Sequence, residues 1–194
     1  MTKPRSSKSD LILSAARKEF LAHGFRRTSI EEIARTAGIA KGTVYLYFNS
    51  KEEVFHAVLK AFFAWFLGRA RLAAKGPDPV EQRLARVLDA KFGAIHQFAS
   101  SSPYGKELLE SSQAVSAGLL RDGERSFVKI LTGLLKDTPM SLSASDAAWL
   151  IYRAARGSDF TIGAAVTANQ MRARLEELAR VLLRGLRSNP SVRS

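Results

Sequence analysis

Apolar residues recur at helical spacing from one end of this 194-residue chain to the other, and this feature limits the folds available to it. In the first such stretch, residues 9–23, Ile12, Ala16 and Phe20 lie four positions apart and mark one helical face. Gly24 follows where a left-handed helix stop is expected, and the chain has no alternating run of β-branched residues bounded by turns. The pattern predicts an all-α protein of about nine helices.

Helix starts are marked by residues whose side chains can bond the free N–H groups of a first helical turn. Ser29 and Glu32 have the spacing of a capping box and predict one such start. The other predicted starts are Asn49 or Ser50, Asp78 as the N-cap before Pro79, Ser143 with Asp146, and Thr167 with Gln170. We expect weaker breaks at Gly118 and at Asp122-Gly123, within residues 103–135.

Net charge indicates the kind of partner. The chain has 30 Lys and Arg against 18 Asp and Glu, which gives +12 and a pI near 10.4. Such an excess favours a polyanion: nucleic acid, an anionic membrane surface or an acidic ligand. The most apolar stretch, residues 54–67, contains His56 and Lys60 and is shorter than the about 20 residues that a membrane span needs. We therefore expect a cytoplasmic protein with no membrane partner.

No pattern in the sequence supports catalysis or a metal site. The chain has no Cys, and its three His residues, His23, His56 and His96, are too widely spaced to form a ligand pair on one helix. The signatures of serine hydrolases, zinc proteases, P-loop proteins and dinucleotide-binding proteins are absent. We expect a binding protein that is not an enzyme and needs no cofactor and no metal.

One segment, at about residues 29–48, has the form of a helix-turn-helix. Two predicted helices are separated only by Gly38-Ile39-Ala40, and in such motifs the second helix lies in the DNA major groove. From spacing alone, an ordinary corner between two bundle helices fits equally well. The residues on the face away from Val44 and Phe48 favour DNA, because they can donate hydrogen bonds to phosphates. These residues are Lys41, Gly42, Thr43, Tyr45 and Tyr47.

The segment TSIEEIARTAGIAKGTVYLYFNSKEE, residues 28–53, closely resembles the DNA-binding signature of the TetR (tetracycline-repressor-like) family. Residues 12–25 resemble the first helix of that family. The resemblance implies an N-terminal three-helix DNA-binding domain, residues 1–53, and a C-terminal helical bundle for ligand binding and dimerisation, residues 54–194. It also implies a homodimeric transcriptional regulator, in most members a repressor, that a small ligand releases from double-stranded DNA with a palindromic operator.

The resemblance also assigns roles to individual positions. Thr28 matches a phosphate contact, as does Lys51, while Lys41 and Gly42 match the start of the recognition helix. Thr43, Tyr45 and Tyr47 match base or phosphate contacts, and Leu46 matches a variable contact that can be apolar only. Ala40 departs from the family, which usually has Ser or Thr there, so the recognition helix lacks an N-cap hydroxyl. Basic residues precede the motif and predict a wider contact with phosphate or the minor groove: Lys3, Arg5, Lys8, Arg17, Lys18, Arg26 and Arg27.

The remainder of the chain holds most of the aromatic residues, and most of these are expected to fill a helical core. Bundle interiors also hold small-molecule sites, and the family resemblance favours such a site here. Our candidate lining residues are Phe62, Phe66, Phe92, His96, Tyr104, Phe127, Trp149 and Tyr152. They predict a hydrophobic or aromatic ligand. Arg153 or Arg156 could orient a carboxylate, although a surface role suits each better.

The last two predicted helices are candidates for the dimer surface, because they combine small residues with a broad apolar stripe. The predicted interface residues are Leu150, Ala154, Met171, Leu175, Leu178, Leu182 and Leu186. Alternatively, this stripe faces the core of its own chain. At the level of function, the alternative is a helical ligand-binding or protein-interaction module that keeps the fold without sequence-specific DNA binding.

Overall fold

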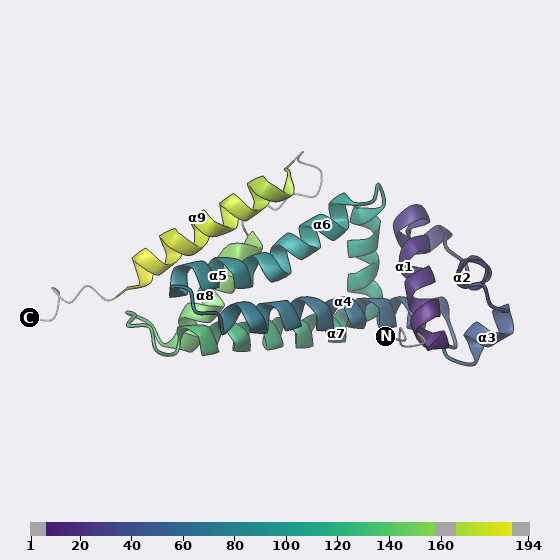
Figure 1. Cartoon of the computed structure of the whole chain (residues 1–194), viewed down its shortest axis with the longest axis horizontal. Coiled ribbons are helices and arrows are strands. Elements are labelled where there is room, and N and C mark those ends of the chain that lie inside the picture. The colour runs from purple at the N-terminus through teal and green to yellow at the C-terminus, as the bar shows by residue number, and fades with distance from the viewer. Residues whose placement is uncertain (1–6, 158–165, 188–194) are drawn as a thin grey trace, which may run out of the picture. The chain divides into compact units, whose positions relative to one another are not determined.

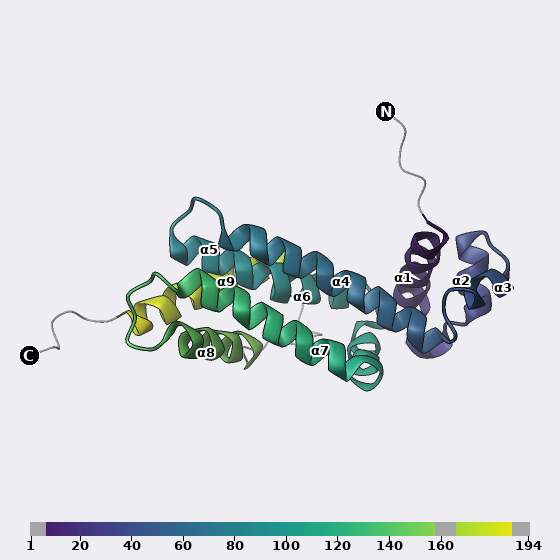
Figure 2. The same cartoon turned by 90° about the horizontal axis from the view of Figure 1, so that it is seen from below.

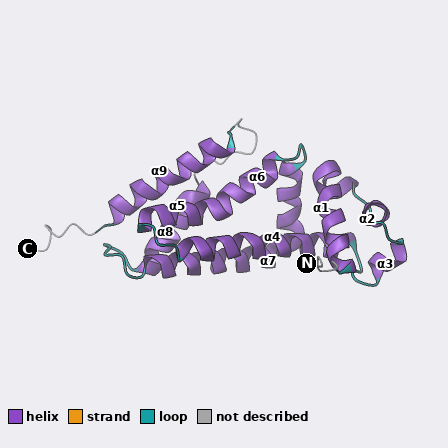
Figure 3. Ribbon diagram, in the orientation of Figure 1, coloured by secondary structure: helices purple, strands orange, loops and turns teal. Residues whose placement is uncertain are grey.

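The computed structural model describes residues 7–157 and 166–187, and within these ranges every regular element is a helix (Figures 1 and 3). This confirms the predicted all-α class. The chain forms two compact units, neither of which is contiguous in sequence. Unit 1 contains residues 1–63 and 98–120, and unit 2 contains residues 64–97 and 121–194. In neither described range is any helix long and apolar enough to cross a membrane.

Unit 1 is built from α1 (Lys8–Arg27), α2 (Ile30–Ala37), α3 (Lys41–Tyr45), the first part of α4 (Lys51–Ala74) and the first part of α7 (Gly105–Leu135). Their apolar faces share one core, whose buried members include Ile12, Ala16, Phe20, Ile33, Val44, Val54, Phe55 and Leu108. Phe20, Phe25 and Phe55 form a ring cluster in it, with centroids 4.7–5.8 Å apart. The spacing that predicted the first helix is therefore the spacing of its buried face.

Gly24 ends the regular part of α1, as predicted. Its φ of 80° and ψ of 168° interrupt the helical conformation, and a further helical turn follows to Arg27. A Cβ at this position would lie 2.6 Å from Glu107 Oε2, and Glu107 Oε1 accepts a hydrogen bond from the Arg26 backbone N–H at 2.8 Å. Glycine is therefore favoured by the backbone conformation, and a Cβ would also displace the Glu107 carboxylate.

Unit 2 contains α5 (Val80–Leu88), α8 (Ala144–Gly157), α9 (Ala168–Leu186) and the remaining parts of α4 and α7. Between α5 and α6 (Ala94–Ser100) lies a π-helical turn, Asp89–Gly93, so α5 and α6 form one continuous helix. Counted in this way, the described residues form eight separate helices, close to the predicted nine. Figures 1 and 2 show α9 beside α5 in both views, and residues of these helices pack together.

Most predicted helix starts are confirmed. Capping boxes open α2 at Ser29 and α9 at Thr167, the Ser50 hydroxyl accepts from Glu53 N–H at the start of α4, and the Ser143 hydroxyl accepts from Asp146 N–H at the start of α8.

Two punctuation predictions are wrong. Asp78 does not cap α5, whose N-cap is Pro79 without a side-chain bond, because the Asp78 carboxylate pairs with Arg86 instead. Gly118 and Asp122-Gly123 do not divide residues 105–135, since α7 continues through them. Its distortion lies at Ser116, with φ −136° and ψ 32°, where the buried hydroxyl hydrogen bonds His56 Nδ1 at 3.0 Å. The glycines therefore do not mark the irregular point of α7.

Candidate nucleic-acid interface

The turn between α2 and α3 fixes how α3 is presented. Gly38 ends α2 with a left-handed φ of 69°, and its N–H donates to Arg35 O at 3.1 Å. The N–H of Ile39 donates to Ala34 O at 3.0 Å, which closes the turn with the paired bonds of a glycine helix stop. The predicted helix–turn–helix geometry is therefore formed with three linking residues.

Helix α3 depends on packing because it lacks an N-terminal cap. Ala40 occupies the N-cap position with no side-chain hydrogen bond, as its missing hydroxyl predicted. Val44 is fully buried in the unit 1 core, and Phe48 packs against that core one turn later. The N–H groups of Tyr47 and Phe48 both donate to Val44 O, at 2.9 and 3.0 Å, so one further turn follows the last residue of α3.

The opposite face of α3 is open. Leu46 is 81% exposed, and Tyr45 and Tyr47 are 46% and 47% exposed. Lys41 and Gly42 are also exposed, and a Cβ placed on Gly42 would meet no atom within 4 Å. An accessible leucine and two tyrosines, next to a glycine with free space around it, form an exposed apolar and aromatic patch of the kind that can mark an interaction site. We call Lys41, Gly42, Tyr45, Leu46 and Tyr47 the α3 surface.

Lys41 has a partner within its own unit. Its ammonium pairs with the Glu31 carboxylate on α2 and lies 5.7 Å from the centroid of the Tyr45 ring. The hydrogen bond with Glu31 raises the pKa of Lys41 and lowers the pKa of Glu31, so both groups are charged at neutral pH. Sequence analysis missed this pair, although Glu31 belongs to the segment that identified the motif.

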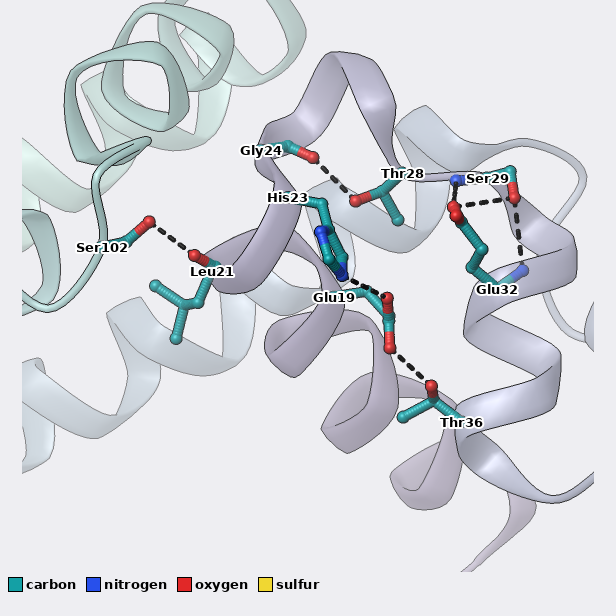
Figure 4. A network of polar contacts seen from close by, with 9 residues as sticks. All are labelled: Glu19, Leu21, His23, Gly24, Thr28, Ser29, Glu32, Thr36 and Ser102. Carbon is teal, nitrogen blue, oxygen red and sulfur yellow. Dashed lines mark hydrogen bonds and ion pairs between the residues drawn. The ribbon is translucent and has the colours of Figure 1, made fainter.

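Two predicted DNA contacts are placed differently. Thr28 is 2% exposed, and its hydroxyl donates to Gly24 O at 2.7 Å, so this side chain supports the α1–α2 corner and offers nothing to a phosphate (Figure 4). The Lys51 ammonium donates to Arg26 O at 3.2 Å and lies 4.6 Å from the Phe25 ring centroid, which ties α4 to the end of α1. Both residues act first as supports of the corner.

The α1–α2 corner is also held by a polar network, which lies outside the cluster of Phe20, Phe25 and Phe55. Figure 4 shows Glu19 between His23 and Thr36, with Thr36 Oγ1 donating to Glu19 Oε1 at 2.5 Å. Ser29 and Glu32 form the capping box beside it, and the Ser102 hydroxyl donates to Leu21 O. This network fixes α2, and with it the turn that presents α3, against α1.

Of the predicted basic contacts, Lys8, Arg17, Lys18, Arg26 and Arg27 lie on exposed or half-buried positions of α1, and Arg27 Nη1 donates to Tyr104 Oη at 3.5 Å. Lys3 and Arg5 lie outside the described residues. The positive charge thus extends along α1 beside the helix–turn–helix.

Comparison with known proteins bears on this segment directly. Residues 12–58 match the family model described as bacterial regulatory proteins, tetR family. This segment belongs to the TetR family. Its match begins in α1 and ends in α4, so it contains the α1–α2 corner, the turn and the whole α3 surface.

Two relatives and one solved structure extend the comparison beyond the TetR segment. The chain is 34% identical over 104 residues to the HTH-type transcriptional repressor KstR2 of Mycolicibacterium smegmatis, which covers 53% of this chain and 50% of that protein. It is 46% identical over 145 residues to the HTH-type transcriptional regulator RutR of Escherichia coli O157:H7, which covers 75% of this chain and 63% of that protein. A transcriptional regulator from Cytophaga hutchinsonii shares the fold, with a TM-score of 0.79 at 19% identity over 94% of this chain and 100% of the other.

Outside the TetR segment, the structure brings together four of the eight predicted ligand residues. Phe92, Phe127 and Tyr152 have ring centroids 6.1–6.2 Å apart in unit 2, and Trp149 lies edge-on to Tyr152 at 6.0 Å. We call these four residues the unit 2 ring cluster.

The other four candidates have these positions. Phe66 is fully buried on α4, and the His96 ring hydrogen bonds Val166 O at 2.9 Å. Phe62 and Tyr104 belong to unit 1, where Phe62 contacts Phe98 and Tyr104 contacts Arg27. Phe62 and Tyr104 therefore belong to a different unit from the unit 2 ring cluster, and the lining of a ligand site by the remaining candidates stays a prediction.

The unit 2 ring cluster lies around Lys91, a residue that the sequence analysis did not identify. The Lys91 ammonium lies 4.5 Å from the centroid of the Tyr152 ring, 5.1 Å from that of Phe127 and 5.6 Å from that of Phe92. The signal was available, because Lys91 follows Leu88 by three positions and Leu84 by seven on an apolar helical stripe. A lysine on such a stripe points into a core.

The predicted dimer stripe is only partly available for a partner. Met171, Leu175 and Leu186 are buried within one chain, because the inward row of α9 runs through them together with Ala179 and Leu183. For these three positions the predicted dimer contact is wrong, because the side chains are buried in the core of their own chain. Leu150 is exposed, and Ala154, Leu178 and Leu182 are half-buried, so these four positions remain predictions. Among the residues that the structure describes, no group of three or more metal-ligating side chains is clustered.

Proposed function

We propose that this chain is a homodimeric, DNA-binding regulator of transcription, and that it represses by occupying a palindromic operator from which a small ligand releases it. The observation that carries this proposal is the α3 surface, with one lysine, two tyrosines and a leucine left accessible around an open Gly42. In functional terms, residues 1–53 would bind DNA, and residues 54–194 would hold the effector and dimer surfaces.

The chemistry of the α3 surface suits the major groove. Lys41 can exchange Glu31 for a phosphate, and the phenol hydroxyls of Tyr45 and Tyr47 can donate to phosphates or base edges. Gly42 lets the backbone approach the DNA, since no side chain intervenes. Leu46 has no polar atom in its side chain and suits a thymine methyl group.

A dimer accounts for a palindromic site and for control by a ligand. Two α3 helices must be separated by about 34–36 Å, or a multiple of it, to enter successive major grooves on one face of the duplex. We place the two-fold contact on α8 and α9, at Leu150, Ala154, Leu178 and Leu182. A ligand that favours a different separation weakens DNA binding by its differential binding energy, about 1–3 kcal/mol in coupled systems.

Selection of bound sequences from random duplexes, followed by a salt titration, tests the proposal. We expect an enriched palindrome and a steep loss of affinity with salt. Leu46→Ala should change the base preference at one position of each half-site. Leu72→Ala is the matched control, because Leu72 is 75% exposed on α4 in unit 2. A selection that yields no palindrome would overturn the proposal and favour a helical ligand-binding or protein-interaction module.

A further inference from the structure

Lys91 is a buried charged side chain that has no role in the proposed DNA contacts. It is 7% exposed and lies in the π-helical turn Asp89–Gly93, between α5 and α6. Its ammonium donates a hydrogen bond to Tyr152 Oη at 3.1 Å and is surrounded by the rings of Phe92, Phe127 and Tyr152. π-helical turns are rare and are found frequently at functional sites.

Among residues 7–157 and 166–187, no acid is in direct contact with the Lys91 ammonium, and none of the ion pairs includes Lys91. Glu124 on α7 exerts a favourable charge effect on Lys91 and also interacts with the Tyr152 side chain. It pairs in addition with Arg156 on α8, whose positive charge opposes that of Lys91. Burial lowers the pKa of Lys91 to about 8, and burial raises the pKa of Tyr152 to about 12, so the ammonium faces a neutral phenol.

A buried cation among aromatic faces is half of a binding site for an amphipathic anion. The ring faces stabilise the ammonium and offer apolar surface, while a negative charge in direct contact with the ammonium is missing among the described residues. A carboxylate supplies that charge and adds a charge-assisted hydrogen bond. A neutral ligand of the same shape would leave the ammonium without a negatively charged partner in contact with it.

We propose that Lys91 is the anchor for the effector's anionic group, and that the effector is a small carboxylate whose apolar part packs against Phe92, Phe127 and Tyr152. This inference rests on the proposed function of a ligand-released regulator. It adds an anionic group to the hydrophobic or aromatic ligand expected from the sequence, and it assigns the recognition of that group to Lys91 rather than to Arg153 or Arg156.

The test compares matched pairs of ligands on the full-length protein without DNA. The probes are phenylacetate and octanoate, each beside its amide, phenylacetamide and octanamide, with affinities measured by calorimetry at pH 7. We expect at least one carboxylate to bind about tenfold more tightly than its amide, the effect of one charge-assisted hydrogen bond. Lys91→Met should abolish this preference, whereas Lys129→Met, which removes an exposed charge from α7 in the same unit, should retain it.

A second readout follows the proton. A bound carboxylate favours the charged amine, so the pKa of Lys91 should rise from about 8 on binding, with Glu124, Arg156 and Tyr152 as the neighbouring titratable groups. Binding at about pH 8.5 should therefore take up a proton, seen as different heats in two buffers of different ionisation enthalpy. Tyr152→Phe keeps the charge and should keep the preference, which separates the charge of Lys91 from its hydrogen bond.

Equal affinity for acid and amide, retention of the preference in Lys91→Met, or no binding of either carboxylate at millimolar concentration would each overturn the inference. The proposed function fails separately. A carboxylate that binds through Lys91 without weakening operator binding would contradict ligand release alone. A carboxylate that releases DNA equally from wild type and Lys91→Met would contradict the role of Lys91 alone.

Discussion

Two lysines, Lys41 in unit 1 and Lys91 in unit 2, show how differently the two units use the same side chain. Lys41 is exposed and paired with Glu31, a contact that raises its pKa. Lys91 is buried among rings without an ion pair in the described ranges, and burial lowers its pKa to about 8.

The difference lies in what a ligand gains at each position. An exposed ion pair contributes little to stability, so a phosphate can replace Glu31 with little loss. A buried cation without a counter-ion is destabilising, so a ligand that supplies the counter-ion is favoured. Lys41 suits a partner that is bound and released along a surface, whereas Lys91 suits a small anion taken into the interior.

The largest expected effect concerns dimerisation, because specific operator binding by the α3 surface is expected to need a second copy of the chain. Replacing Leu178 and Leu182 with Glu would place unpaired carboxylates in the proposed two-fold contact, at several kcal/mol each. The dimer should dissociate and specific operator affinity should collapse, because only one half-site is then bound. Titration of Lys91, which lies within one chain, should be unchanged. Sedimentation equilibrium and operator titration measure these outcomes.

Arg174→Gln with Arg187→Gln is the matched control for this variant, because it makes the same change in net charge at exposed positions. It should remain dimeric. If the leucine variant also stays dimeric with full operator affinity, the interface lies elsewhere.

The second prediction concerns the pH dependence of stability. Folded Lys91 loses its proton near pH 8, whereas the unfolded chain retains it to about 10.5, so the unfolded state binds more protons between these values. The free energy of unfolding should rise with pH across this window by about 3 kcal/mol, from the size of the shift. Lys91→Met should lack this rise and be more stable than wild type at pH 7. Urea unfolding of both proteins from pH 7 to 10.5 measures the difference.

The raised pKa of Tyr152 acts in the opposite direction above about pH 10, because the unfolded tyrosine then loses its proton first. Because Lys91 contacts Tyr152, the comparison of wild type with Lys91→Met is read below about pH 10, where Tyr152 stays protonated in both states. A wild-type curve parallel to that of Lys91→Met would show that Lys91 is not desolvated, and the contrast with Lys41 would disappear.

The third prediction separates the two units by stability. Gly24→Ala should destabilise unit 1 by about 2 kcal/mol, because its conformation excludes side chains and Glu107 occupies the space of the Cβ. Gly38→Ala is the matched control: its φ is also positive, but no atom lies within 4 Å, so a cost of about 1 kcal/mol is expected. Chemical denaturation gives both values. The pKa of Lys91 should be the same in each variant as in the wild type. Equal losses would mean that Glu107 moves away freely.

The smallest effect expected is at Lys41. Lys41→Ala should weaken binding to all duplexes by a similar factor and lower the slope of log affinity against log salt by about one. Glu31→Gln should have the opposite effect, tightening binding by about twofold to fivefold, because Lys41 no longer leaves a partner. Glu52→Gln, which removes another exposed carboxylate at the start of α4, controls for net charge. An unchanged salt slope with altered base preference would mean that Lys41 contacts a base.

The sequence predicted the local elements well where local interactions decide them. The stop at Gly24, the capping boxes at Ser29 and Thr167, and the turn after Gly38 each depend on residues within a few positions. It failed where other contacts compete: Asp78 pairs with Arg86 rather than capping α5. In addition, α7 is distorted at Ser116, which hydrogen bonds to His56, and not at Gly118.

The same division holds for the candidate sites. By itself, the sequence determined the all-α class, since helical spacing recurs along the whole chain. It also determined the helix–turn–helix and the residues of the α3 surface, since the spacing and the residue types of one short segment together indicate them. Only the tertiary structure decided that Thr28 is buried, that Met171 and Leu175 serve the core, and that Lys91 meets three rings from α7, α8 and its own π-helical turn. The physical reason is that helical periodicity identifies which face of a helix is buried, but the neighbours on that face come from residues far apart in the chain.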